Sequence, residues 1–277
     1  MKRCSIVCLV LFAAAVAGAW AQARQAEPPA PAPPSMRVLR TDDFAIDGKG
    51  ASPAWSKAEW QMLAPRAAGT DPHPTRVKML YSPTGLYVLM DGEDSVLTAT
   101  MREDFLDLWT EDVFEFFLWP DQAHPVYFEY EISPLGFELP ILVPNFGGQF
   151  YGWRPWHYEG PRKIQKAVSV RGGPAETGAR ITGWTAEVFL PYDLLKPLRN
   201  VPPQPGTVWR ANVYRMDYDG GRSVSWNWAP VRGTFHQPDR FGTLVFEYGF
   251  NVENVDEVWS ESEQDHVRGE RRTPPAT

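Results

Sequence analysis

Short alternating runs of apolar and polar residues, separated by turn-forming residues, constrain the fold of this chain most strongly. Residues 126–133 (VYFEYEIS) are the clearest run, because side chains two positions apart share one face of an extended strand. One face carries Phe128, Tyr130 and Ile132, and the other carries Tyr127, Glu129 and Glu131. Helical signal within this region is thin and amounts to residues 192–198, after Pro191. The pattern predicts an all-β chain.

Turn chemistry joins these runs into hairpins. Ser82-Pro83-Thr84-Gly85 separates residues 76–81 from 86–91, because proline presets a turn and glycine accepts a positive φ. A second hairpin joins residues 112–119 to 126–133 through a turn that proline bounds at both ends. Further strands are expected at 164–170, 184–190, 208–216, 223–228 and 244–247. Many short strands with turns between them favour an antiparallel β-sandwich of jelly-roll type, in one domain.

The N-terminal residues have the pattern of a secretory signal peptide. Lys2 and Arg3 supply positive charge, and residues 6–20 are apolar. Ala19-Trp20-Ala21 fits a cleavage site, so residues 1–21 are expected to be removed on export to the periplasm or to the outside of the cell. The apolar stretch is shorter than the roughly 20 residues of a spanning helix, which disfavours a retained membrane anchor.

The rest of the chain divides into three expected parts. Residues 22–35 are rich in proline and alanine, which favours an extended linker. Residues 36–248 contain all the predicted strands and form the expected domain. Residues 249–277 are acidic, and we expect them to form a partly disordered tail.

Cysteine usage and charge exclude several classes of protein. Both cysteines, Cys4 and Cys8, lie in the expected signal peptide, so the mature chain can form no disulfide, iron–sulfur or cysteine–zinc site. The formal net charge is -7, and the loss of Lys2 and Arg3 with the signal peptide makes it more negative. An acidic chain without a basic stripe is a poor ligand for nucleic acids or anionic membranes.

The aromatic content is high, with 12 Trp, 10 Tyr and 15 Phe, which is more than a core of this size needs. Trp109 precedes a strand, where a loop can present it, and residues 150–158 form a dense aromatic run that includes Trp153 and Trp156. Aromatic rings cover the apolar faces of sugars, while carboxylates and guanidinium groups bind the hydroxyls. For Trp55, Trp184 and Trp209 we expect core packing instead.

An ordered set of motifs resembles the family 9 carbohydrate-binding modules and their free-standing relatives. The resemblance extends from about Val38 to Glu247. Its main pieces are 111–117 (EDVFEFF), 127–136 (YFEYEISPLG), 183–188 (GWTAEV), 209–212 (WRAN), 225–226 (SW) and 235–242 (FHQPDRFG).

The resemblance implies a DOMON-like β-sandwich that is not an enzyme. Such modules accompany xylanases, bind the reducing end of a glucan or xylan chain between two tryptophans, and carry structural calcium. By motif position, Trp109 is similar to the first of these tryptophans, and Glu115 is similar to the carboxylate that binds sugar hydroxyls. Trp226 is the favoured second tryptophan, and Trp228 is the alternative. The implied partners are a carbohydrate and a glycoside hydrolase that degrades polysaccharide.

Other residues are candidates for supporting roles. Arg210 and Asn212 share one strand face and could donate to sugar hydroxyls, although a structural ion pair of Arg210 is equally open. Glu115 lies on an otherwise apolar face and needs a partner or a ligand, and Arg76, Arg210 and Arg215 are its candidate ion-pair partners. Oxygen-rich clusters could hold calcium, but solvated turns have the same composition. The four candidate calcium ligands are Asp43, Asp47, Asp91 and Asp94.

Three other classes of protein stay open. A glycoside hydrolase could use Glu129 and Glu131, which lie on one strand face. A haem-binding DOMON-like domain would need a methionine opposite a histidine. The absence of Cys-x-x-Cys-His excludes c-type haem, and we expect no haem. A structural envelope protein is the third class. The residues that a haem could use are Met90 or Met101 with His157 or His236.

Overall fold

The computed structural model describes residues 32–67, 73–147 and 149–248. The expected signal peptide, most of the expected linker and the acidic tail lie outside the described residues. None of the helices in the described ranges is both long and apolar enough to span a membrane.

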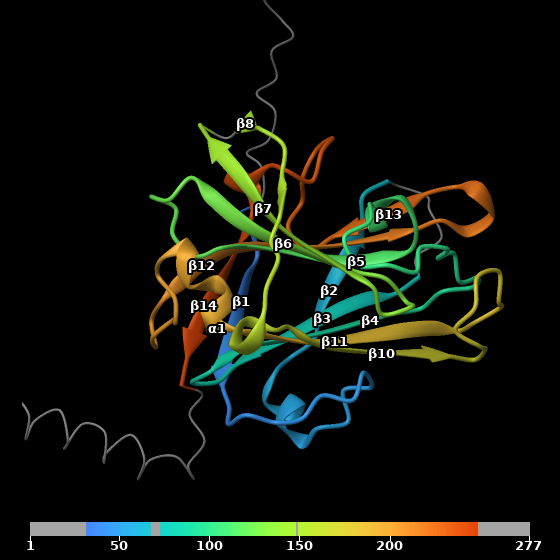
Figure 1. Cartoon of the computed structure of the whole chain (residues 1–277), viewed down its shortest axis with the longest axis horizontal. Helices are drawn as coiled ribbons and strands as arrows, with labels where there is room; N and C mark the ends of the chain where they lie inside the picture. Colours follow the sequence, from blue (N-terminus) through green and yellow to red (C-terminus); the bar gives the residue numbers. More distant parts are fainter. Residues whose placement is uncertain (1–31, 68–72, 148, 249–277) are drawn as a thin grey trace, which may run out of the picture. The chain divides into compact units, whose positions relative to one another are not determined.

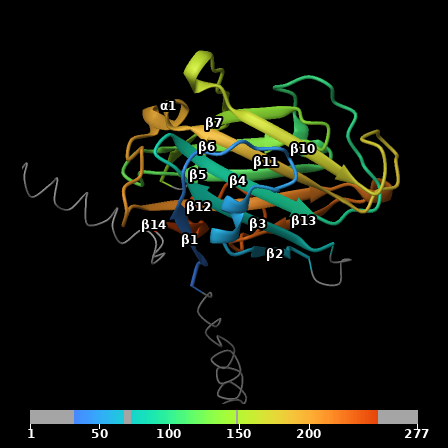
Figure 2. The ribbon, with the colours of Figure 1, turned by 90° about the horizontal axis from the view of Figure 1, so that it is seen from below.

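The strands follow one hydrogen-bonded path that folds back on itself into two layers (Figure 1). The first layer contains β10 (Gln165–Arg171), β11 (Gly183–Pro191), β4 (Gly85–Gly92) and β3 (Thr75–Tyr81). The second contains β12 (Val208–Asp217), β5 (Val113–Trp119), β6 (Val126–Ile132), β7 (Glu138–Phe146) and β8 (Gln149–Phe150). Figure 2 looks onto the first layer, with the second layer behind it. Neighbouring strands within both layers are antiparallel, which confirms the predicted antiparallel β-sandwich.

Two pairs of strands connect the layers at their edges. β1 (Ser35–Arg40) pairs in parallel with both β3 and β14 (Gly242–Glu247), and β14 continues to β12. β2 (Gln61–Pro65) pairs with β3 and with β13 (Val224–Asn227), which pairs with β12. A short strand, β9 (Arg154–Pro155), pairs with β7. The two connections hold β3 and β12 on opposite sides of one core.

The helices are short and lie in the connections. The prediction of helix at 192–198 is confirmed by α1 (Tyr192–Leu195) followed by η4 (Lys196–Leu198). The other turns of 3-10 helix are η1 (Pro53–Lys57), η2 (Leu108–Thr110), η3 (Gly160–Arg162), η5 (Asp219–Gly221) and η6 (Pro238–Arg240).

All nine predicted strands are present, but β1, β2, β7 and the two-residue strands β8 and β9 lie outside the predicted ranges. β7 cannot be recognised from the sequence pattern because it contains Pro140 and Pro144, and a proline within an apolar run argues against a central strand. β7 tolerates both because only the short β8 and β9 pair with its other edge. β2 is short and partly exposed, so it lacks a clear apolar face.

The main core lies between the layers. Phe128, Tyr130 and Ile132 face into it, as their alternation predicts. Trp184 of the first layer stacks on Phe114 of the second, with ring centroids 3.8 Å apart. The prediction that Trp184, Trp209 and Trp55 are core residues is confirmed, since all three are buried.

The outer face of the first layer is covered by residues 41–60, which cross it as an irregular segment (Figure 2). Glu187 of β11 holds this segment in place. One carboxylate oxygen accepts from the backbone N–H of Asp47 and of Gly48, each at 2.9 Å, and the other accepts from Trp55 Nε1 at 2.7 Å. Residues 41–60 therefore cover part of this face and leave a hollow beside Trp60, Arg76 and Asp91.

Arg215 of β12 is the one fully buried guanidinium among the described residues, and it links the two layers. It donates to Thr75 Oγ1 of β3 at 3.0 Å and to Asp94, just after β4, at 3.1 Å. It also donates to Asp217 on its own strand at 2.8 Å. The ring of Trp226 lies 4.8 Å from the guanidinium carbon and shields it from water.

We predict that Arg215→Met destabilises the protein by about 3–5 kcal/mol, because it leaves Asp94 and Asp217 buried without their cation. Urea unfolding followed by circular dichroism measures the loss. Adding Asp94→Asn to Arg215→Met should recover part of it, since one uncompensated charge is removed. An Arg215→Met protein as stable as the parent would contradict a structural role for this ion pair.

Candidate functional site

A cavity of about 590 Å³ opens on the outer face of the second layer. Its floor comes from β5 and β6, and loops that follow β7, β12 and β13 form its walls. The lining combines two kinds of side chain. Three are carboxylates, Glu115, Glu129 and Glu131, and seven are aromatic or imidazole rings, namely Trp109, Phe117, Phe150, Trp153, Tyr218, Phe235 and His236.

Strand alternation places the three carboxylates together. On β5 the residues that flank Glu115 on its own face, Val113 and Phe117, pack in an apolar cluster outside the main core. Glu131 lies directly opposite Glu115 on β6, and Glu129 is two residues away on the same face. The prediction that Glu129 and Glu131 share a face is therefore confirmed. Both are buried below the cavity mouth.

The carboxylates are poorly satisfied by the protein itself. Glu115 Oε1 and Glu129 Oε2 are buried and have no hydrogen-bond partner, whereas Glu131 Oε2 accepts from the backbone N–H of Trp109 at 2.9 Å. Burial raises the pKa of Glu115 to about 8, opposed by the positive charge of Arg66. Burial and the neighbouring carboxylates raise the pKa of Glu129 and of Glu131 well above the ordinary value. The three side chains form the acidic floor of the cavity, which retains protons at neutral pH and can accept hydrogen bonds from a ligand.

Trp109 is held by its backbone while its ring faces solvent. Its N–H donates to Glu131, and its carbonyl accepts from the hydroxyl of Tyr218 at 2.9 Å. Leu108 beside it is fully buried and anchors η2. The ring itself is 48% exposed, which is unusual for tryptophan, and it lines the cavity. This arrangement presents an indole face at a fixed position.

The loop after β13 provides the opposite wall. Phe235 stacks on Tyr214 with ring centroids 4.1 Å apart, and Tyr214 donates to the Phe235 carbonyl at 2.9 Å. His236 stacks on Phe150 at 4.1 Å, and its Nδ1 lies 2.6 Å from the Tyr127 hydroxyl. Burial lowers the pKa of His236 to about 4, so the imidazole is neutral near pH 7.

Arg66, after β2, is the one arginine or lysine among the described lining residues. Its guanidinium lies over the Phe235 ring at 4.7 Å and donates to Ser225 Oγ and to the Gly233 carbonyl. The predicted partners of Glu115 were Arg76, Arg210 and Arg215. These pair elsewhere, with Asp91, with loop carbonyls and with Asp94, respectively. Sequence reasoning missed Arg66 because it follows β2, a strand that the sequence pattern did not reveal.

The structure does not bring Trp226 or Trp228 into the cavity. β13 pairs with β12 in a register that sets Trp226 opposite the buried Arg215. The side chains of Trp226 and Trp228 both pack in the main core. Trp226 is 1% exposed and Trp228 is also buried, which leaves neither free to stack on a ligand. Ser225, one position from Trp226, has the opposite orientation and lines the cavity. The interpretation of Trp226 or Trp228 as the second clamping ring is therefore withdrawn.

Two further candidates support the site without lining it. Arg210 donates to the carbonyls of Asp239 and Phe241. Asn212 is fully buried, donates to the Ala229 carbonyl at 2.9 Å and accepts from the Ala229 N–H at 2.8 Å. Both therefore fix the loop that carries Phe235 and His236. Of the pair in the aromatic run, Trp153 lines the cavity, whereas Trp156 packs on the core and donates to the Leu194 carbonyl.

The four predicted calcium ligands do not form one site. Asp43 accepts from Thr84 and Tyr87, and Asp47 accepts from backbone N–H groups. Asp91 pairs with two arginines, Arg76 and Arg171, beside a second hollow on the first layer, and Asp94 pairs with Arg215. Asp91 and Asp94 are thus paired with arginines, whereas Asp43 and Asp47 accept from neutral donors, and calcium binding at these residues stays a prediction.

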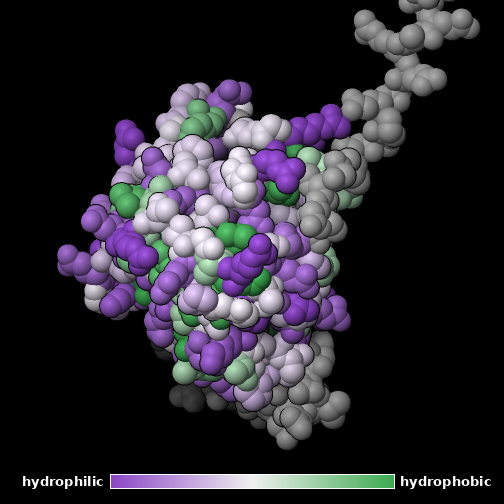
Figure 3. Space-filling model, turned by 90° about the vertical axis from the view of Figure 1, so that its right-hand side faces the viewer, coloured by the Kyte–Doolittle hydropathy of each residue, from purple (hydrophilic) through white to green (hydrophobic). Residues whose placement is uncertain are grey.

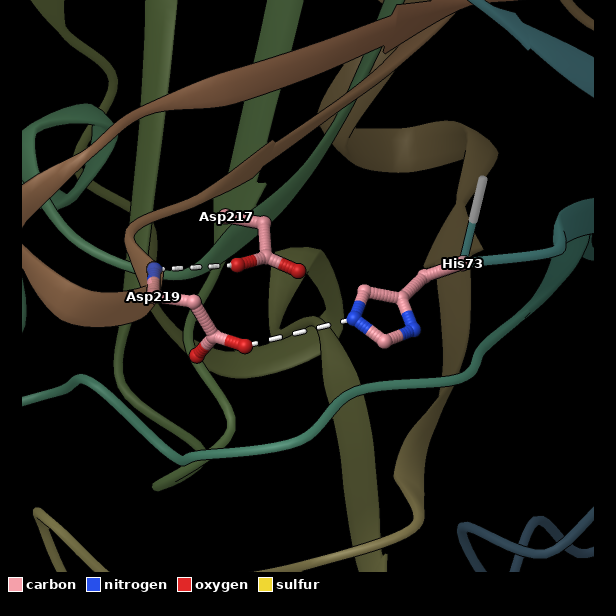
Figure 4. Close-up of side chains that lie close together, drawn as sticks. All are labelled: His73, Asp217 and Asp219. Atoms are coloured by element: carbon pink, nitrogen blue, oxygen red, sulfur yellow. Dashed lines mark hydrogen bonds and ion pairs between the residues drawn. The ribbon is translucent and has the colours of Figure 1, made fainter. Parts of the chain in front are cut away.

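A different group, His73, Asp217 and Asp219, has ligand atoms within 4.8 Å of one another (Figure 4). His73 Nε2 lies 3.9 Å from Asp219 Oδ2, and the Asp219 N–H donates to Asp217 Oδ1 at 3.2 Å. Imidazole with carboxylates suits zinc better than calcium. Because Arg215 already engages Asp217, we assign no ion to this group.

Figure 3 shows this end of the sandwich, where the β12–β13 connection lies, as mainly polar with small apolar patches.

Residues 46–139 match the protein family described as carbohydrate family 9 binding domain-like, and this range contains Trp109 and all three carboxylates of the cavity floor. The predicted resemblance to the family 9 carbohydrate-binding modules is confirmed. No curated protein matches the chain.

Solved structures share the fold. A protein from Bacteroides uniformis, named provisionally as carbohydrate-binding, has a TM-score of 0.63 at 18% identity, over 78% of this chain and 100% of that one. A family 9 carbohydrate-binding module from Caldicellulosiruptor kristjanssonii in complex with cellotriose has a TM-score of 0.55 at 16% identity, over 80% and 96%. The same organism's module with glucose has a TM-score of 0.54 at 18% identity, over 78% and 97%.

The buried floor predicts a specific dependence of stability on pH. Because the pKa of Glu115 rises from 4.5 to about 8 on folding, the folded state binds more protons than the unfolded state between these values. Stability should therefore fall as pH rises through this window, by about 1.4 kcal/mol per pH unit for each such carboxyl. Glu115→Gln, measured by urea unfolding across this window, should reduce the slope by about that amount.

The exposed Glu159 offers a matched control, because Glu159→Gln removes the same charge away from the cavity. This variant should keep the slope of the parent. Equal slopes for the parent and Glu115→Gln would contradict the assignment of Glu115 as a carboxyl protonated by burial.

Proposed function

We propose that this protein is a non-catalytic carbohydrate-binding module that holds its ligand in the cavity over β5 and β6. The observation that carries the proposal is the combination found there: an exposed indole held by its backbone, further aromatic rings and buried carboxylate acceptors. Sugars present apolar C–H faces and polar edges, and this lining offers a partner for each.

In this proposal Trp109 covers one face of the sugar ring, and Trp153 takes the role that the sequence suggested for Trp226. Both indoles line the cavity, and they reach it from different loops. Glu115 and Glu129 accept from hydroxyls through oxygens that have no partner in the protein. Arg66 at the rim donates to hydroxyl oxygens. The rigid sandwich positions these groups before the ligand arrives, which limits the ordering cost of binding.

Catalysis by Glu129 and Glu131 is a weaker reading of the same cavity. A glycoside hydrolase needs two carboxyls whose surroundings push their pKa values apart, so that one donates a proton while the other stays ionised. Burial raises the pKa of Glu129 and of Glu131 in the same direction. Glu131 is also engaged in holding the Trp109 backbone.

Chain ends of β-1,4-linked glucans and xylans are the first ligands to test. The solved family 9 modules with cellotriose and glucose support this choice, as does the matching range of residues 46–139. We further propose that the protein is exported by its expected signal peptide and supports polysaccharide degradation beside a glycoside hydrolase.

We predict that Trp109→Ala weakens binding of a soluble oligosaccharide at least about tenfold, because the ring that covers the sugar face is lost. Isothermal titration calorimetry with cello- and xylo-oligosaccharides measures the effect. Stability should change by only about 0.5 kcal/mol, since the ring is half exposed. Loss of folding in this variant would instead make Trp109 a core residue.

The contrasting variant is Trp226→Ala, which removes a ring that is buried over Arg215. We expect it to destabilise the protein by about 3–5 kcal/mol. Normal stability together with lost sugar binding in Trp226→Ala would restore Trp226 to the site and contradict the placement of the cavity.

A further inference from the structure

We infer that the cavity over β5 and β6 selects sugars that carry a protonated amine, such as glucosamine units, over neutral sugars of the same skeleton. The inference rests on the proposed function, because it names the class of sugar that the same site prefers. Its basis is that three carboxylates lie on the cavity floor, that all three are buried, and that two of them have an oxygen without a hydrogen-bond partner.

The floor presents acceptors that nothing in the protein satisfies. Glu115 is 1% exposed and Glu129 is 4% exposed, yet Glu115 Oε1 and Glu129 Oε2 have no hydrogen-bond partner. A buried carboxylate oxygen without a partner costs free energy that a ligand donor can recover. Both face a cavity of about 590 Å³, which is large enough for a saccharide.

The charges around the floor do not balance. Three carboxylates line the cavity, and Arg66 is the one guanidinium among its described lining residues. Arg66 donates to Ser225 and Gly233 at the rim. His236 lies 3.7 Å from Glu129 Oε2 but is neutral near pH 7, and Tyr127, Tyr214 and Tyr218 are uncharged phenols. Asp107 adds a further carboxyl beside Glu131. No cation among the described residues therefore balances the floor when it ionises, and a bound cation would stabilise the ionised form over the protonated form of the free protein.

An ammonium group fits this floor better than a hydroxyl or a metal ion. It brings three donors and a positive charge to carboxylates that are buried, where screening by salt is weak. A sugar hydroxyl brings one donor and no charge. The three glutamates are not among the described side chains whose ligand atoms gather closely enough to share one metal ion. The aromatic wall still covers the ring face of an amino sugar, so both features of the cavity are used.

Three trisaccharides with one β-1,4-linked skeleton test the inference, because they differ only at carbon 2. They are the glucosamine trimer, its N-acetylated form and cellotriose. Isothermal titration calorimetry of the mature chain at neutral pH should show the glucosamine trimer binding at least about tenfold tighter than cellotriose. Titration in buffers of different ionisation enthalpy should show proton release on binding, since the ammonium ionises the floor.

Glu129→Gln keeps the shape of the side chain and removes its charge. The ratio of the two affinities, glucosamine trimer over cellotriose, should fall toward one in this variant. Glu159→Gln removes an equal charge from an exposed site away from the cavity and should keep the ratio of the parent. A ratio that falls equally in both variants would overturn the role of the floor.

The two proposals fail in different ways. If cellotriose binds as tightly as the glucosamine trimer, the preference for amines is wrong and the proposed carbohydrate binding stands. If the folded protein binds none of the three trimers, both the preference and the proposed function at this cavity are overturned.

Discussion

The ion pairs of Arg215 are the constraint on which the rest of this structure depends. A guanidinium at the centre of a sandwich is tolerated only when carboxylates and hydroxyls surround it, and here they come from both layers. The consequences reach the cavity through β12. Asp217 and then Tyr218 follow Arg215 on the strand and in the turn after it, and the Tyr218 hydroxyl holds the carbonyl of Trp109. The most exposed ring of the site thus depends on a contact made inside the core.

The two faces of the second layer differ, since one packs in the main core and the other carries the cavity. Inward residues such as Phe128 and Trp209 build the main core, whereas outward residues supply both a second apolar cluster and the carboxylate floor. Glu115 lies between Val113 and Phe117, so the apolar cluster is interrupted only where the cavity begins. On the first layer, residues 41–60 pack against the outer face, where hydrogen bonds to Glu187 hold them. The aromatic and carboxylate-lined cavity therefore lies on the second layer, whereas the hollow left on the first layer is lined by ion pairs of Asp91 with Arg76 and Arg171.

Local patterns predicted nine strands and the faces of β6, because alternation and turn residues act over a few positions. The family resemblance pointed to Trp109 and Glu115, and both line the cavity. It also pointed to Trp226, which lies in the core, since the face of a strand residue depends on its register with β12. Arg66 was missed, and His236 was considered only as a haem ligand, because each reaches the cavity from a loop whose path alternation does not predict. Asn212 was expected to bind sugar but holds a loop instead, because two of its hydrogen bonds go to Ala229, in the connection after β13 that alternation does not describe.

The distribution of tryptophan gives the molecule a built-in optical probe. Trp55, Trp184, Trp209, Trp226 and Trp228 are buried, and Trp109 is the one tryptophan among the described residues that is largely exposed. The emission of an indole moves to shorter wavelength when water leaves its surroundings. A ligand in the cavity should change the emission of Trp109 and of the partly buried Trp153, while the five buried rings stay in the environment that they already have. Occupancy of the cavity can therefore be followed in the unlabelled protein.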